Sequence, residues 1–286
     1  MRFMSLAGSA GVAALAMLAT PAFAQDTGTP DEFSGFYVGG TIGYDTQPND
    51  VGESILFDRN LDGTFNDTVT TAAGANAFSP GFCNGSARAT TPAFGCTNDK
   101  DAISYSARLG YDRQVGNFLG GGIVFGAVIE GGKSEIRDSV SAFSTTPARY
   151  TMTREIDFNA SARLRLGYAA NRTLFYGTGG LAYARVDHSF STSNTANAFT
   201  GRGKRDAWGY VAGGGVEQKL GRHFSIGLEY LFNKVKDDNY LVRASAGTAP
   251  ATNPFILAPN TTGTDFKRSY NFMVWHSMRV TAAFRF

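Results

Sequence analysis

Hydrophobic and polar residues alternate along much of this chain, most regularly at its C-terminal end. In the segment 269–286 most even-numbered positions are apolar, among them Phe272, Val274, Met278 and Val280. Most odd-numbered positions carry Ser, Asn, Thr or Arg, and the apolar exceptions are Met273, Trp275 and Ala283. A period of two sustained over this length predicts a strand with one apolar and one polar face. The predicted strand is longer than most strands of soluble domains.

Seven earlier segments are also strand-like, so we predict eight strands in all. They lie at 33–45, 101–114, 118–132, 154–168, 173–188, 206–220, 224–235 and 269–286. Each is long enough to cross a bilayer as a tilted strand, for which about nine to eleven residues suffice. An even number of such strands, with lipid on one face and a lumen on the other, is typical of a membrane β-barrel.

The connections between these strands support the same architecture. Three are short, at 115–117, 169–172 and 221–223, and four are long, at about 46–100, 133–153, 189–205 and 236–267. Short and long connections alternate strictly, as in barrels with tight periplasmic turns and large extracellular loops. We therefore predict an all-β, eight-stranded antiparallel transmembrane β-barrel with both termini in the periplasm.

The N-terminal region predicts export from the cytoplasm. Arg2 precedes a run rich in Leu, Ala, Val and Met, and Ala22-Phe23-Ala24 is the small-x-small sequence that signal peptidase cleaves. We predict a signal peptide at 1–24, a periplasmic linker at 25–32 and the barrel at 33–286. A membrane-anchoring helix is the alternative, but glycine and serine interrupt the apolar run.

No later segment reaches the roughly twenty uninterrupted apolar residues that a membrane helix requires. An exported chain of this kind is either soluble or crosses lipid as a closed barrel, because only closure satisfies every backbone hydrogen bond. The composition favours the barrel, with 35 Gly, 23 Phe and 12 Tyr in 286 residues and only 17% charged residues. The formal charge of +2 becomes +1 without Arg2, and a charge this small gives no reason to expect a nucleic-acid partner. The expected partner of the barrel is outer-membrane lipid.

The alternation also assigns charged residues to the lumen. In the segment 154–168, Phe158 and Leu164 point one way while Arg163 and Arg165 point the other. The charged residues assigned to the inner face in this way are Arg108, Asp112, Glu130, Arg163, Arg165, Glu217, Glu229, Arg279 and Arg285. Unpaired charges in so confined a space would be costly, so we expect a paired network that fills the interior. Eight strands leave room for little more than side chains, which argues against a wide pore but leaves a narrow channel open.

Two cysteines, Cys83 and Cys96, lie in the first long connection. In an exported protein such a pair predicts a disulfide that closes a loop. A metal site is the alternative, but it would need further ligands nearby, and no histidine is close in the sequence.

The same connection contains a segment that resembles a calcium loop. Asp58, Asn60 and Asp62 place oxygen atoms at positions 1, 3 and 5, and Gly63 follows at position 6. Position 12 is Val69, so the usual bidentate glutamate is missing. A solvated turn of Asn, Asp and Gly is the alternative. Apart from this calcium ion, no cofactor is expected.

The three histidines give little support for catalysis. His223 lies in a predicted periplasmic turn and His276 falls on the lipid-facing side of its strand. His188 lies at the outer end of a strand between Asp187 and Ser189, and adjacent strand residues point to opposite faces, which argues against a ready-made dyad. We therefore predict that the chain is not an enzyme, with a rim enzyme acting on outer-leaflet lipid as the alternative.

Six short motifs in the predicted strands resemble a known family. They are GFYVGG at 35–40, LGYD at 109–112, LGY at 166–168, YGTGGLAY at 176–183, GGGVE at 213–217 and LEY at 228–230. The chain is similar in these segments to the small opacity-like outer-membrane β-barrels, the surface antigens of α-proteobacteria. The resemblance covers nearly all strands and little of the long connections.

The resemblance implies an outer-membrane location and a closing strand whose terminal aromatic residues, Phe284 and Phe286, are read by the outer-membrane assembly machinery. It further implies a role in envelope integrity and surface antigenicity, and in some members adhesion, small-solute passage or haem binding. We accordingly predict a structural, surface-exposed barrel whose loops contact host or surface ligands. A porin-like channel for small solutes is the alternative.

Overall fold

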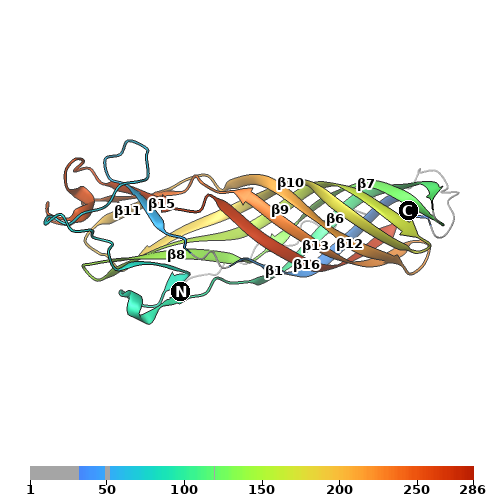
Figure 1. The fold of residues 1–286 in the computed structure, drawn as a ribbon, viewed down its shortest axis with the longest axis horizontal. Coiled ribbons are helices and arrows are strands. Elements are labelled where there is room, and N and C mark those ends of the chain that lie inside the picture. Colours follow the sequence, from blue (N-terminus) through green and yellow to red (C-terminus); the bar gives the residue numbers. More distant parts are fainter. Residues whose placement is uncertain (1–31, 49–51, 119) are drawn as a thin grey trace, which may run out of the picture.

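The computed structural model describes residues 32–48, 52–118 and 120–286. The predicted signal peptide at 1–24 and almost all of the linker at 25–32 lie outside the described residues. Eight long antiparallel strands form a barrel (Figure 1). They are β1 (Gly35–Thr46), β6 (Ala102–Phe118), β7 (Gly121–Ser134), β9 (Ala148–Ala170), β10 (Thr173–Thr192), β12 (Asp206–Lys219), β13 (Phe224–Lys236) and β16 (Phe272–Arg285). The predicted eight-stranded antiparallel barrel is thereby confirmed.

The last strand closes the barrel by pairing with the first. β16 runs antiparallel to β1, with Arg285 opposite Tyr37 and His276 opposite Thr46. The remaining pairs follow the order β16-β13-β12-β10-β9-β7-β6-β1, so each of the eight strands has two neighbours. Closure leaves no strand edge of the barrel exposed to lipid.

Short turns join the strands at the end of the barrel that carries the C-terminus (Figure 1). Only Asn171 and Arg172 separate β9 from β10, and Asn171 has a positive φ of 51°, which suits asparagine in a two-residue hairpin turn. The predicted turn at 115–117 is wrong, because β6 continues to Phe118 and β7 begins only at Gly121. The β6–β7 register shifts between Val115 and Phe118.

The outer wall of the barrel is a belt of exposed apolar side chains. Leu164 is 72% exposed and Met278 69% exposed, whereas their strand neighbours Arg163 and Ser277 are buried. This is the two-faced pattern that the alternation predicts. Among the residues that the structure describes, no helix is long and apolar enough to cross a membrane.

The long connections form a second unit at the opposite end, where β11 and β15 are labelled in Figure 1. We call this unit, residues 52–100, 135–153, 187–205 and 237–270, the head. Its strands are β2 (Ile55–Asp58), β3 (Gly81–Asn84), β4 (Ser86–Ala87), β5 (Cys96–Thr97), β8 (Arg137–Ser144), β11 (Ala198–Arg202), β14 (Leu241–Ser245) and β15 (Thr264–Arg268), with 3-10 turns η1 (Pro92–Phe94) and η2 (Pro254–Ile256). The order β11-β14-β15-β2 makes a separate four-stranded sheet, and β8 pairs with the outer part of β9.

An aromatic core holds the head together. Phe57, Phe78, Tyr150, Phe255 and Phe266 are all buried in one cluster. Fully burying a side chain of this size stabilises by about 1.5–3 kcal/mol relative to leaving it exposed. The connections predicted as loops therefore fold together as one packed unit.

Candidate functional site

The charged residues predicted for the lumen meet in two adjoining clusters. In the cluster nearer the periplasmic end, Arg165 donates to Asp112 at 2.9 Å and to Glu217 at 2.8 Å. Arg285 donates to the same carboxylates at 2.8 and 2.7 Å. The hydroxyl of Tyr37 accepts a further hydrogen bond from Arg165 at 2.8 Å. Two guanidinium groups and two carboxylates thus neutralise one another, although the five side chains come from five strands.

A glycine makes room for the tyrosine in this cluster. A Cβ atom at Gly110 would lie 2.3 Å from the ring of Tyr37, closer than real contacts allow. The guanidinium carbon of Arg285 lies 4.6 Å from the centroid of the same ring, within cation–π range. The LGYD motif therefore has two roles in this cluster. Gly110 leaves room for the Tyr37 ring, and Asp112 supplies a negative charge that pairs with the arginines.

The second cluster lies farther from the periplasmic turns. Arg163 donates to Glu229 at 3.0 Å and to Glu130 at 2.8 Å. Arg279 donates to Glu229 at 2.6 Å and to Glu130 at 2.9 Å. Arg108 approaches Glu229 at 3.7 Å, so the two clusters together hold five arginines against four carboxylates. All nine residues that parity assigned to the lumen lie in these clusters.

Beyond the charges, the lumen contains a small polar cavity and then an apolar layer. The cavity, lined by residues such as Ser104 and Asn159, has a volume of about 20 Å³, which is room for about one water molecule. The apolar layer includes Met273, Trp275 and Leu231, all buried. Met273 and Trp275 interrupt the polar face of β16 because they close the outer half of the lumen.

Phe33 closes the periplasmic mouth. Its side chain is fully buried against Leu174 and Ala169. Its backbone N–H donates to the side chain of Gln114 at 2.9 Å, and its ring centroid lies 5.1 Å from the guanidinium carbon of Arg285. Side chains thus fill the barrel from the mouth to the apolar layer.

A third ionic layer lies between barrel and head, and sequence reasoning missed it. Arg268 donates to Glu53 at 2.7 Å and to Asp138 at 2.6 Å, and Arg154 donates to Asp138 at 2.6 Å. All four side chains are buried. Burial favours a higher pKa for Asp138, but Arg154 and Arg268 outweigh it and hold that pKa below its usual value.

Asp99 lies at the edge of this layer. It accepts a hydrogen bond from the backbone N–H of Ser139 at 2.8 Å. Burial, together with the negative charge of Asp138, raises the pKa of Asp99 to about 7. Glu53 and Asp138 belong to the predicted long connections, and Arg268 lies directly after the last of these. Strand parity assigns no direction to these three residues, so no local signal could have identified the group.

Each histidine has a specific partner in the structure. His188 is hydrogen-bonded to Asp237 at 2.8 Å and stacks on Tyr240, with only 5% of its side chain exposed, so it does not form a catalytic rim with Asp187 or Ser189. His276 is hydrogen-bonded at 2.6 Å to the hydroxyl of Tyr230, which gives the polar residue on the lipid-facing wall a partner. His223 contacts the backbone carbonyl of Arg285 at 3.0 Å.

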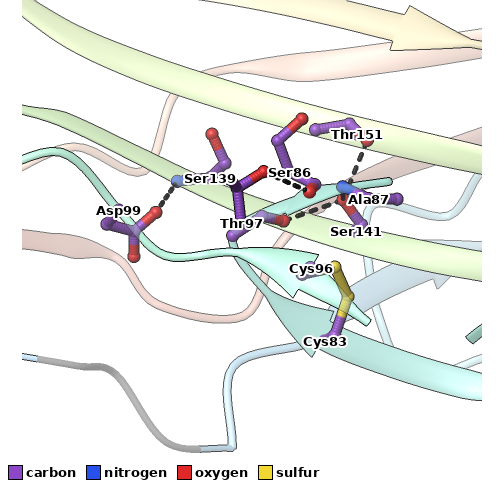
Figure 2. Close-up of a disulfide and its surroundings, with 10 residues drawn as sticks. Cys83, Ser86, Ala87, Cys96, Thr97, Asp99, Ser139, Ser141 and Thr151 are labelled. Carbon is purple, nitrogen blue, oxygen red and sulfur yellow. Dashed lines mark hydrogen bonds between the residues drawn. A yellow bond between two sulfur atoms is a disulfide. The ribbon is translucent and has the colours of Figure 1, made fainter. Parts of the chain in front are cut away.

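Cys83 and Cys96 form a disulfide in the head, with Cα atoms 6.2 Å apart (Figure 2). The bridge closes an arm, residues 81–97, that runs from β3 through η1 to β5. Ser141 of β8 fixes the arm, because its hydroxyl donates to the carbonyl of Gly85 and accepts from the N–H of Ala87, each at 2.9 Å.

The segment that resembles a calcium loop forms a tight turn. The carboxylate of Asp58 accepts from the backbone N–H groups of Asp62 at 3.1 Å and Gly63 at 2.8 Å, and the side-chain oxygen of Asn60 accepts from Asp62 at 3.0 Å. This is the geometry of the Asn/Asp turn that was the alternative. In the part of the chain that the structure describes, no group of three or more His, Cys, Asp or Glu could hold a metal ion. Calcium binding stays a prediction.

The aromatic residues of the predicted assembly signal lie at the periplasmic end of β16. Phe284 and Phe286 are exposed, and their ring centroids lie 5.3 Å apart. The backbone N–H of Phe286 donates to the carbonyl of Phe36 at 2.9 Å. Their role in assembly stays a prediction.

The chain is similar to outer-membrane proteins of α-proteobacteria. It is 30% identical over 133 residues to the 31 kDa outer-membrane immunogenic proteins of Brucella melitensis and Brucella suis, a match that covers 46% of this chain and 53% of each relative. It is 34% identical over 83 residues to the 22 kDa outer membrane protein of Rhizobium leguminosarum, covering 29% of this chain and 36% of that protein. The chain thus spans about half the length of the Brucella relatives it matches. No protein-family profile matches it.

Two solved barrels cover most of the chain at low similarity. The outer membrane protein OprG from Pseudomonas aeruginosa has a TM-score of 0.48 and 13% identity, covering 89% of this chain and 97% of its own. Ail, the attachment invasion locus protein of Yersinia pestis, has a TM-score of 0.31 and 11% identity, covering 88% and 99%. At these values neither bears on function.

The closed barrel with its apolar belt and the α-proteobacterial relatives lead to one conclusion. The chain is a surface-exposed β-barrel protein of the outer membrane, and its relatives are outer-membrane proteins, as the strand motifs implied. The names of these relatives describe antigens and membrane proteins rather than enzymes.

Proposed function

We propose that the barrel is a sealed anchor that holds the head at the cell surface, where it contributes to envelope integrity and contacts other molecules. The filled lumen carries this proposal. Side chains occupy it from Phe33 at the mouth, through both charge clusters, to the apolar layer around Trp275. The packed aromatic core of the head supports the second half, because a rigid head can present a fixed surface to a partner.

A channel for small solutes is the competing function, and the geometry of the clusters argues against it. A passing ion would have to separate buried arginines from their carboxylates, and removing one partner of such a pair costs about 3–5 kcal/mol. The cavity above the clusters, about 20 Å³, is too small for a hydrated solute.

Conductance decides between the two functions. The purified chain, inserted into planar bilayers, should give no reproducible current steps, while a wide porin added to the same bilayer serves as the positive control. Reproducible steps from this chain would overturn the sealed anchor. Steps that change size in an Arg279→Gln variant would further place the ion path through the second cluster.

We also propose that the chain does not modify outer-leaflet lipid. A rim enzyme needs an accessible base, whereas the side chain of His188 is buried against Asp237 and Tyr240. Lipid A from cells producing the wild-type chain and from cells producing His188→Asn should have the same composition. A modification present only with the wild-type chain would establish the enzyme instead.

A further inference from the structure

A cavity of about 230 Å³ lies in the head where all four long connections meet. The first connection contributes Phe78, the second Thr146, the third Thr195 and the fourth Phe255. The second connection reaches the cavity through the turn between β8 and β9. Because β9 runs from this turn to the short turn before β10, the β8–β9 turn lies at the end of the molecule opposite the periplasmic turns. The cavity therefore exists only in the folded head and is placed toward the exterior.

Three aromatic rings form the floor of this cavity. The ring centroids of Phe78 and Tyr150 lie 5.3 Å apart, those of Tyr150 and Phe255 5.7 Å, and those of Phe78 and Phe255 5.9 Å. All three side chains are buried in the head core, so the floor is fixed. An apolar floor of this kind favours a ligand with a face of C–H groups.

The walls are polar and uncharged. Thr145, Thr146 and Thr195 are exposed at the cavity, and Asn194 and Asn253 line it as well. Hydroxyl and amide groups both donate and accept hydrogen bonds. Among the described residues that line the cavity none is charged, so a sulfated, phosphorylated or carboxylated ligand would have no counter-charge there.

Hydrogen bonds between the connections hold the polar wall in place. Asn194 of the third connection donates to the hydroxyl of Tyr150 at 3.0 Å. Asn197 donates to Asn253 of the fourth connection at 3.1 Å and to the carbonyl of Ser245 at 2.9 Å. A site that is formed in advance loses less free energy on ordering when a ligand binds.

We propose that this cavity binds a single neutral sugar residue of a glycan outside the cell. A pyranose has an apolar face for the aromatic floor and hydroxyl groups that can bond to the exposed threonine hydroxyls of the wall, and it carries no charge. This proposal rests on the function proposed above, in which the head contacts other molecules at the cell surface, and it names the kind of molecule that is bound. It is independent of conduction, since a current through the barrel would overturn the sealed anchor but not the sugar site.

Saturation-transfer NMR tests the proposal on the full-length mature chain, folded in a zwitterionic detergent without a sugar head group. The probes are the methyl glycosides of glucose, galactose and mannose, together with N-acetylglucosamine and the anionic glucuronate. At least one neutral sugar should show transfer, with a dissociation constant on the order of millimolar, as expected for about a dozen non-hydrogen atoms. Glucuronate should bind at least tenfold more weakly.

Two variants at the cavity and one matched control locate the binding. Thr195→Trp should fill the opening and abolish transfer, and the milder Thr145→Val, which removes one hydroxyl, should weaken binding about threefold to tenfold. Thr261→Val, an equally exposed threonine that does not line the cavity, should bind as the wild type does. Heat-modifiable gel mobility and an unchanged tryptic pattern verify folding.

Three outcomes would overturn the sugar site. One is the absence of transfer from every neutral sugar at tenfold the expected dissociation constant. Another is equal transfer in wild type and in folded Thr195→Trp, which would place the sugar elsewhere. The third is tighter binding of glucuronate than of the neutral sugars, which would contradict recognition by an uncharged cavity.

Discussion

Arg285 of β16 donates a 2.8 Å hydrogen bond to Asp112 of β6, although β1 separates these two strands in the barrel wall. Arg165 of β9, a strand that β7 separates from β6, donates to the same carboxylate at 2.9 Å. The cluster therefore ties together strands that share no backbone hydrogen bonds. Arg165→Met should leave the buried carboxylates of Asp112 and Glu217 undercompensated and cost about 3–5 kcal/mol of unfolding free energy. Urea unfolding of the folded barrel in lipid vesicles measures this loss.

Arg113 provides the matched control for that prediction. It follows Asp112 on β6 but is exposed on the outer face. Arg113→Met should change the unfolding free energy by less than about 1 kcal/mol. A similar loss in both variants would show that the lumen cluster contributes no more than a surface arginine.

The disulfide should protect the arm from proteolysis. Cys83 and Cys96 are 13 positions apart, and closing a loop of about 15 residues is worth roughly 3 kcal/mol in the chain-entropy description. In a Cys83→Ser/Cys96→Ser variant, trypsin should cleave after the exposed Arg88 at least tenfold faster. Dithiothreitol should accelerate cleavage of the wild type and have no effect on the variant. Unchanged cleavage would mean that Ser141 and β8 hold the arm without the bridge.

The barrel could be predicted because each of its strands has two different environments. Leu228 faces outward and its neighbour Glu229 faces the lumen, so the pattern repeats every two residues over the length of β13. The same parity identified every charged residue of the two lumen clusters. The misplaced turn after β6 arose because Gly116, with its positive φ of 72°, lies within an irregular part of the strand rather than in a turn.

The head could not be predicted in this way. Apart from β8, its strands are short, with four residues in β2 and five in β15, and the partners of these two strands are remote in sequence. Phe57 of β2 packs on Phe266 of β15, and Arg268 pairs with Glu53 across 215 positions. Contacts of this kind leave no period in the local sequence. The ionic layer and the cavity of the head therefore became visible only in three dimensions.

The pH of the medium should control the attachment of the arm through Asp99. Asp138, Glu53 and Arg268 surround this carboxyl group, and burial is the main reason that its pKa rises to about 7. A carboxyl group with a raised pKa in the folded state binds its proton more tightly there than in the unfolded state. Its contribution to stability is thus fully present below about pH 4 and is lost as the pH rises through about 7.

Proteolysis of the arm at different pH values measures this effect. Cleavage after Arg88, corrected for the intrinsic activity of trypsin on a peptide substrate, should become faster between pH 6 and 8 in the wild type. Asp99→Asn cannot ionise but still accepts the Ser139 hydrogen bond, so its corrected rate should stay constant over this range. A parallel increase in both proteins would assign the pH dependence to another group.

The calcium prediction for Asp58, Asn60 and Asp62 has a measurable consequence. Asp58 already accepts two backbone N–H groups, but a carboxylate has about four lone-pair sites and can also bind a cation. Calcium should then slow tryptic cleavage after Arg59 relative to a chelator, and Asp58→Asn should remove the difference. Equal cleavage of the wild type in calcium and in chelator would leave the segment as a hydrogen-bonded turn.

The two tryptophans report on opposite faces of the barrel. Trp208 is 63% exposed on the outer wall, where its ring lies 4.9 Å from that of Tyr183, while Trp275 is 2% exposed inside the lumen. Brominated lipids quench only fluorophores in contact with the bilayer, so quenching in vesicles should arise almost entirely from Trp208. Trp208→Phe should remove most of the quenching, and Trp275→Phe should retain it. Substantial quenching in Trp208→Phe would contradict the inward orientation of Trp275 and, with it, the apolar layer that closes the outer half of the lumen.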